Sequence, residues 1–283
     1  MSNPLIAARD AFVTRNPARV FSREGRNWDV LEAGTGPVLL LLPGTLGQGD
    51  VFWQQIDALS DRLRIVALSY PETGTLEAWA ADILALINDM ALLKVSLLGT
   101  SLGGYLAQYI AATHPTRIAR LIAANTLVDT TPVQTARPYV LDLHNESIAV
   151  LRAGFTDGLS AWAEADPTVG NVVDLLLQEV NGRISEAGLR ARLSALKQAP
   201  ALPPPALPAD MITSIESDDD PLIPAAMRAQ TRTALQPAVA YRFRHGGHFP
   251  YLTQAPAYTA LLEQVMGLEK TGGIWGKSAE RVL

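Results

Sequence analysis

The sequence predicts an α/β protein with a mostly parallel central sheet flanked by helices. Short, continuous apolar runs such as 37–44 recur along the chain, as expected for strands buried on both faces of a parallel sheet. Stretches with apolar residues at three- and four-residue steps, such as 75–93, lie between these runs and are typical of helices. The chain has 283 residues, 48% hydrophobic and 18% charged, which suits one large domain carrying an insertion.

The expected elements alternate along the chain. The first strand, 28–34, leads into a turn at Gly34 to Gly36. Further strands are expected at 37–44, 63–71, 94–100, 118–127, 210–217 and 239–247, and the segment 239–247 is expected to be the last. Helices are expected at 50–62, 75–93, 101–115 and 255–268, with Thr75 as an N-cap and Pro115 as a stop signal.

Residues 128–209 interrupt this alternation. They contain no convincing strand, and helical patterns are expected at 147–165, 171–181 and 185–199 before the Pro-rich stretch 199–210. A segment of this length is too long for a single crossover. The expected organisation is therefore a core of residues 1–127 and 210–283 with a helical cap insertion at 128–209.

Composition narrows the classes of function. The formal net charge is −5 without a block of Lys or Arg, which disfavours nucleic acid as a partner. There is no cysteine, and no group of residues has metal-ligand spacing, so no metal or other cofactor is expected. The N-terminal segment lacks a signal-peptide pattern, and no apolar run could span a membrane. We expect a cytoplasmic protein.

One serine is the candidate nucleophile. The residues from Gly99 to Gly103 read G-x-S-x-G and place Ser101 between a buried strand and an amphipathic helix. Glycines two residues before and after the serine allow a sharp strand-to-helix turn, where larger side chains would clash. The pattern also occurs by chance, and the alternative interpretation is a strand–helix turn without a catalytic role. Its context favours a nucleophile.

A serine needs a base, and the base needs an orienting acid. On a turn of this kind the acid and then the histidine follow the serine along the chain. Of the four histidines, His248 comes just after the last expected strand, behind two glycines, and is the candidate base. His245 is the fallback. His114 is expected to be a surface or C-cap residue, and His144 a structural residue or one near a pocket.

The candidate acid lies in a run of three aspartates, 218–220, after the strand 210–217. Asp220 is preferred because it opens the segment Asp-Pro-Leu-Ile-Pro, a loop form that usually carries such an acid. Asp219 is the alternative, because a shift of one residue at the end of the strand would exchange the two positions. Such a run can also be only a solvated turn.

The oxyanion hole is expected to use two backbone N–H groups. One belongs to Leu102, the residue after the nucleophile. The other belongs to the glycine-rich loop after the strand 37–44, where Thr45 is the best candidate and Leu46 the second. The same loop could be an ordinary glycine-rich turn.

Taken together, these segments resemble the α/β-hydrolase superfamily over nearly the whole chain. The segments 44–71, 99–111, 125–131 and 246–252 resemble its maspardin-like branch more narrowly. The resemblance implies a cofactor-independent serine hydrolase that cleaves an ester or related acyl bond of a small molecule. It also implies an alternative, because members of that branch are regarded mainly as binding partners. Acyl transfer and carbon–carbon cleavage use the same residues and stay open, as do any protein partner and the oligomeric state.

Overall fold

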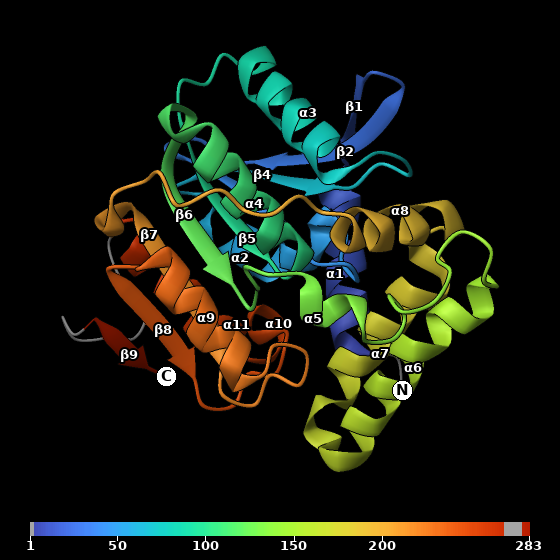
Figure 1. The fold of residues 1–283 in the computed structure, drawn as a ribbon. Helices are drawn as coiled ribbons and strands as arrows, with labels where there is room; N and C mark the ends of the chain where they lie inside the picture. Colours follow the sequence, from blue (N-terminus) through green and yellow to red (C-terminus); the bar gives the residue numbers. More distant parts are fainter. Residues whose placement is uncertain (1–2, 269–278) are drawn as a thin grey trace.

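One sheet runs through the centre of the molecule (Figure 1). The computed structural model describes residues 3–268 and 279–283. In this part of the chain nine strands form the sheet in the order β1-β2-β4-β3-β5-β6-β7-β8-β9. The strands β1 and β2, and likewise β2 and β4, pair antiparallel, while every pair from β4 to β9 is parallel. Their bounds are β1 Arg19–Arg23, β2 Arg26–Ala33, β3 Val38–Leu42, β4 Arg64–Ser69, β5 Val95–Thr100, β6 Ile118–Ala124, β7 Ile212–Ser217, β8 Val239–Phe243 and β9 Glu280–Val282.

The expected mostly parallel sheet is confirmed, but the prediction missed both of its outer strands. The segment 239–247 is not the last strand, because β9 follows it and pairs with β8. Strand β1 lies at the other edge and is exposed along most of its length. Neither edge strand carries the continuous apolar run that is typical of a strand buried on both faces, so a search for such runs could not find them.

Helices cover both faces of the sheet. One face is packed by α3 (Leu76–Asp89), α4 (Leu102–Thr113) and α9 (Ala225–Leu235). The other is packed by α1 (Pro4–Arg15), α2 (Trp53–Leu59) and α11 (Ala255–Val265). The expected N-cap of α3 is present, since the Thr75 hydroxyl accepts a hydrogen bond from the Ala78 N–H. Helix α1 was not predicted from the sequence.

The chain between β6 and β7 contains helices and no strand among the residues that the structure describes. It contains α5 (Thr131–Gln134), α6 (Ile148–Ala165), α7 (Gly170–Gln178) with a π-helical extension over Glu179–Arg183, and α8 (Glu186–Lys197). These helices gather at one end of the sheet, where α7 contacts the N-terminal helix α1 (Figure 1). The short helix α10 (Pro250–Thr253) precedes α11. Short 3-10 turns are found at Gly49–Phe52, Pro115–Arg117, Pro167–Val169 and Ala209–Met211.

A buried network of charges ties these helices to the core. Arg9 on α1 donates to Glu179 at 2.9 Å, and both side chains are almost fully buried. Arg183 pairs with the same Glu179 and with Asp50 in the turn after β3. Burial raises the pKa of the Glu179 carboxyl, and Arg183 acts in the opposite direction. The network therefore joins the N-terminal helix, the helical insertion and the loop after β3.

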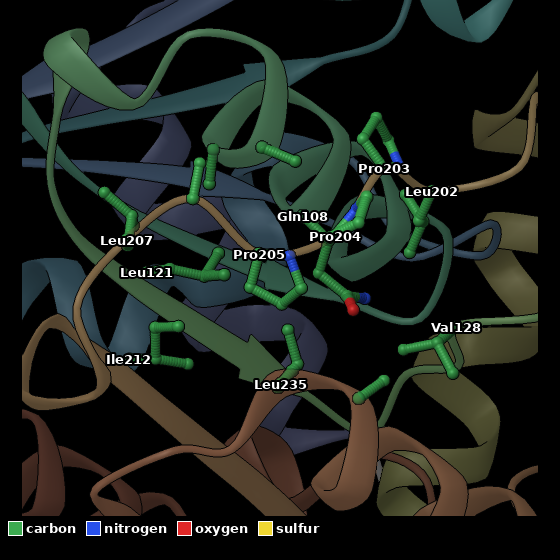
Figure 2. Close-up of a pocket in the computed structure, with 14 residues that line it drawn as sticks. Gln108, Leu121, Val128, Leu202, Pro203, Pro204, Pro205, Leu207, Ile212 and Leu235 are labelled. Atoms are coloured by element: carbon green, nitrogen blue, oxygen red, sulfur yellow. The ribbon is translucent and has the colours of Figure 1, made fainter.

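The Pro-rich segment returns the chain to the sheet along the outside of α4 (Figure 2). Pro203, Pro204 and Pro205 cross a small apolar cavity of about 340 Å³ between α4, β6 and α9. The buried Gln108 on α4 lines this cavity and donates to the carbonyls of Gly104 and Leu127, both at 3.0 Å. Leu202 and Leu207 of this segment pack against the core, while Pro204 and Pro205 are exposed.

Candidate active site

Ser101 occupies a strained turn between β5 and α4. Its φ of 52° and ψ of −118° place a non-glycine residue in a sparsely populated region of backbone space. Neighbouring groups hold this conformation: the Ser101 N–H donates to the Ala124 carbonyl at 3.0 Å, and the Thr126 hydroxyl donates to the Ser101 carbonyl at 2.8 Å. Strain that the surroundings maintain in this way is typical of functional sites.

The two glycines of the motif are needed for close packing. A Cβ atom on Gly99 would lie 2.0 Å from the Gly103 carbonyl oxygen, and one on Gly103 would lie 2.3 Å from the Leu42 carbonyl oxygen. Both distances are impossible contacts, so α4 can approach β5 and β3 this closely only with glycine at these positions. The turn therefore requires the residues that the motif supplies.

His248 and Asp220 are in direct contact. The His248 Nδ1 lies 2.9 Å from Oδ2 and 3.0 Å from Oδ1 of Asp220, and both side chains are buried. Burial by itself would raise the pKa of Asp220. The charge interaction and hydrogen bond with His248, together with hydrogen bonds from Asn125 and the Ile223 N–H, outweigh burial and hold that pKa below its ordinary value. A charged carboxylate only accepts, so the His248 proton lies on Nδ1 and Nε2 is the basic nitrogen.

The three neighbouring aspartates have different partners. Asp219 Oδ1 accepts from the N–H groups of Gly246 and Gly247, both at 2.9 Å, and so holds the loop that carries His248. Asp218 pairs with Arg242 at 3.3 Å near the surface. Asp220 is the aspartate that the structure places against the histidine.

The other histidines lie away from this pair. His245 is exposed, and its carbonyl accepts from Gln254 Nε2 at 2.8 Å. His114 is exposed at the end of α4, where Nδ1 lies 2.9 Å from the Thr113 hydroxyl. His144 is exposed within the insertion. His248 is the histidine that shares a cavity with Ser101.

This cavity has a volume of about 370 Å³. Ser101, His248 and Thr45 line it, but within the described residues no hydrogen bond joins the Ser101 hydroxyl to His248. The insertion supplies part of the wall, which is mostly apolar and includes Val133, Pro138, Tyr139, Phe155 and Leu196. Burial raises the pKa of Tyr139 to about 12, so its hydroxyl stays protonated at neutral pH.

The backbone beside Ser101 offers unpaired donors. Leu102 is the first residue of α4, so its N–H has no partner within the helix. In the loop after β3, the Gly47 N–H donates to the Gly44 carbonyl at 3.1 Å, while the N–H groups of Thr45 and Leu46 make no hydrogen bond with other described residues. Gly44 lies against the serine, since a Cβ there would be 3.1 Å from the Ser101 Cβ. Of the predicted oxyanion-hole donors, Leu102 directly follows the serine, and Thr45 and Leu46 line the same cavity as the serine.

A model of the alpha/beta hydrolase family matches residues 39–261, most of the chain. The chain belongs to the alpha/beta hydrolase family. Maspardin of Mus musculus is 27% identical over 241 residues, which cover 82% of this hydrolase-family chain and 76% of maspardin. Maspardin of Homo sapiens is 26% identical over the same shares of the two chains. The resemblance to the maspardin-like branch is therefore confirmed.

Solved structures share the fold of this α/β-hydrolase family member. A hydrolase from Pseudomonas aeruginosa PA01 superposes with a TM-score of 0.74 at 19% identity, covering 89% of this chain and 98% of its own. A thermophilic esterase from Thermogutta terrifontis superposes with a TM-score of 0.72 at 22% identity, covering 88% and 97%. At these identities the likeness establishes the fold alone.

The sequence analysis of this α/β-hydrolase chain missed two polar residues around the site. Asn125, directly after β6, has a φ of 42° and donates from Nδ2 to Asp220 Oδ2 at 2.9 Å. Arg192 on α8 donates to the loop after β3. A polar residue at the end of a buried strand could have signalled Asn125, whereas Arg192 is one of several basic residues on an amphipathic helix and carries no such signal.

The described residues contain no group of three or more His, Cys, Asp or Glu side chains that could hold a metal ion. Within the same residues, no helix has both the length and the apolar character needed to cross a membrane.

Proposed function

We propose that this protein is a serine hydrolase that cleaves a carboxylic ester or a related acyl bond. One observation carries the proposal: Ser101 on a strained turn faces the same cavity as His248, whose Nδ1 is held by the buried Asp220. This arrangement leaves Nε2 as the basic nitrogen of His248, the histidine that shares the cavity with the serine.

In the proposed reaction the Ser101 Oγ attacks the carbonyl carbon of the substrate, and its proton passes to His248 Nε2. The electron pair of the carbonyl bond moves to oxygen, and the N–H groups of Leu102 and Thr45 stabilise that charge. Collapse of this intermediate expels the alcohol, which takes the proton from His248. A water molecule then repeats the same steps on the acyl-enzyme and releases the acid. The Asp220 carboxylate stabilises the imidazolium throughout.

The cavity favours a small or medium apolar acyl group. Its wall is mostly apolar. Among the described lining residues, the only lysine or arginine is Arg137, which is exposed. Much of the wall comes from the helices between β6 and β7, so residues 128–209 are proposed to act as a cap over the core formed by 1–127 and 210–283. A small-molecule substrate and a cytoplasmic location belong to the same proposal.

Labelling with a fluorophosphonate probe tests this function. We expect the folded protein to be labelled and Ser101→Ala to be unlabelled. Turnover of p-nitrophenyl butyrate should be lost in Ser101→Ala and in His248→Gln but retained in His245→Gln, because His245 is exposed and outside the cavity. Equal labelling of the protein and of Ser101→Ala would refute the assignment.

A second function, binding without chemistry, is favoured by the likeness to maspardin over 82% of the chain. It predicts a folded protein that neither reacts with the probe nor turns over the ester. Ser101-dependent turnover would exclude a purely binding role.

A further inference from the structure

Arg192 is a buried cation that binds the loop after β3. Its side chain is 1% exposed, and Nη1 donates to the carbonyls of Thr45 at 3.0 Å and Gly47 at 2.9 Å. Nη2 donates to Gln48 Oε1 at 2.9 Å, and the guanidinium lies 5.3 Å from the centre of the Tyr70 ring. Within the described residues no carboxylate forms an ion pair with it. The partners of this charge are the loop carbonyls, the Gln48 amide and an aromatic face.

The charge survives burial at neutral pH. Burial lowers the pKa of Arg192 to about 10, with Tyr70 and Glu179 acting in the opposite direction, so the guanidinium remains protonated. A buried charge without a partner carboxylate is costly, and the dipoles that stabilise it must be held in a fixed direction. Arg192 therefore constrains the loop carbonyls strongly.

Fixing the carbonyls also fixes the N–H groups of the same loop. A trans peptide is planar, with its C=O and N–H pointing in opposite directions. Arg192 holds the Thr45 carbonyl, so the Leu46 N–H points away from Arg192. The Gly44 carbonyl is held within the turn by the Gly47 N–H, so the Thr45 N–H likewise points away from that hydrogen bond.

The residues that carry these two donors line the cavity of the serine. Thr45 and Leu46 line the cavity that contains Ser101, whereas Arg192 is not among its described lining residues. Tyr70, whose ring faces the guanidinium, donates from its hydroxyl to the Pro43 carbonyl at 2.8 Å. This hydrogen bond holds the start of the same loop. Carbonyls of this loop thus accept from the cation, while the residues with unpaired N–H groups line the same cavity as the serine.

We propose that Arg192 is a positioning residue for the oxyanion hole. From the helical insertion it holds the Thr45 carbonyl, which orients the Leu46 N–H directly, and the Gly47 carbonyl, which steadies the turn that orients the Thr45 N–H. The inference rests on the proposed serine-hydrolase function. Arg192 touches neither the substrate nor the reacting atoms and transfers no proton. Its effect is to keep the donors aimed at the oxygen before charge develops, which is where most of the benefit of such donors arises.

The kinetic test compares Arg192→Gln with the intact protein on p-nitrophenyl butyrate. We expect kcat to fall about 10- to 100-fold while KM changes less than about 3-fold, since the donors act mainly on the transition state. The inhibition constant of butylboronic acid, which forms a tetrahedral adduct with a reactive serine, should rise by a similar factor. An unchanged kcat, or a loss confined to KM, would overturn the proposal.

The matched control is Arg190→Gln. Arg190 lies on the same helix but donates to the carbonyls of Leu143 and Glu146, away from the loop after β3. We expect its kcat to stay within about 2-fold of the parent. Should Arg192→Gln fail to fold, Arg192→Lys replaces it, because an ammonium group keeps the charge but cannot span two carbonyls and the Gln48 amide in the same geometry.

Hydrogen–deuterium exchange separates this inference from the proposed function. We expect Arg192→Gln to raise exchange in the peptide covering 43–50 and to leave β5 unchanged, whether or not the parent protein turns over an ester. Absence of turnover by the parent would refute the proposed function alone. Unchanged exchange in 43–50 would refute the role of Arg192.

Discussion

At the scale of single residues, adjacent aspartates have separate tasks. Asp220 contacts the ring of His248, whereas Asp219 contacts the backbone of the loop that carries it. Both carboxylates act on the same histidine: Asp220 by its contact with Nδ1 of the ring, and Asp219 by holding the backbone before it. Because an asparagine can still accept hydrogen bonds from N–H groups, replacing each aspartate by asparagine distinguishes the two roles.

We expect Asp220→Asn to lower kcat/KM roughly 10³- to 10⁴-fold, since a neutral amide neither stabilises the imidazolium nor fixes the tautomer with Nε2 as the base. Asp219→Asn is the matched control and should lower kcat/KM less than about 10-fold, because its amide oxygen can still accept from Gly246 and Gly247. Steady-state kinetics on p-nitrophenyl butyrate measures both. The reverse order of effects would make Asp219 the acid.

At the scale of elements, the contact between α4 and the sheet is set by backbone approach. A Cβ atom on Gly103 of α4 would clash with the Leu42 carbonyl oxygen of β3. A Cβ atom on Gly158, in the exposed part of α6, would meet nothing within 4 Å. The same substitution should therefore have opposite effects at these two helical positions.

We expect Gly103→Ala to lower the free energy of unfolding by about 2 kcal/mol or more, because α4 must move away from β3. Gly158→Ala should raise it by about 0.5–1 kcal/mol through the better helix propensity of alanine. Urea unfolding followed by circular dichroism measures both changes. A Gly103→Ala protein as stable as the parent would show that α4 can shift without cost.

The elements that could be read from the sequence are those that bury apolar runs. Strands β3, β4 and β6 each contain such a run, and β5, β7 and β8 continue the alternation of strands and helices with more polar residues. The motif around Ser101 predicts its own turn. The edge strands β1 and β9 leave none. Asn125 and Arg192 reach the site through contacts with Asp220 and Thr45, which lie 95 and 147 residues away along the chain. Patterns within a short window of sequence cannot predict contacts between residues so far apart along the chain.

At the scale of the whole molecule, the insertion shares both hydrophobic cores with the sheet. Leu151, Leu189 and Leu193 join the core on the face of α3 and α4, while Leu159 and Val172 join the core on the face of α1 and α2. The buried pair Arg9–Glu179 adds a charged link between α1 and the insertion. The helices over the cavity are therefore built into the domain rather than attached to it.

This arrangement predicts a single cooperative unfolding transition. Calorimetry should give one endotherm whose calorimetric and van't Hoff enthalpies agree. Limited proteolysis below the transition should not cut preferentially within 128–209. Two endotherms, or early cleavage confined to that segment, would mean that residues 128–209 unfold on their own.

The two outer strands have a consequence for how the protein behaves at high concentration. Strand β1 begins and ends with arginine, and β9 is three residues long and includes Glu280 and Arg281. An open sheet edge is a template on which further chains can pair, and charged or very short edge strands oppose such pairing. The charged residues that interrupt the apolar pattern of β1 and β9 made these strands hard to predict. The same residues oppose the pairing of neighbouring molecules with the sheet edges, which would extend the sheet into an aggregate.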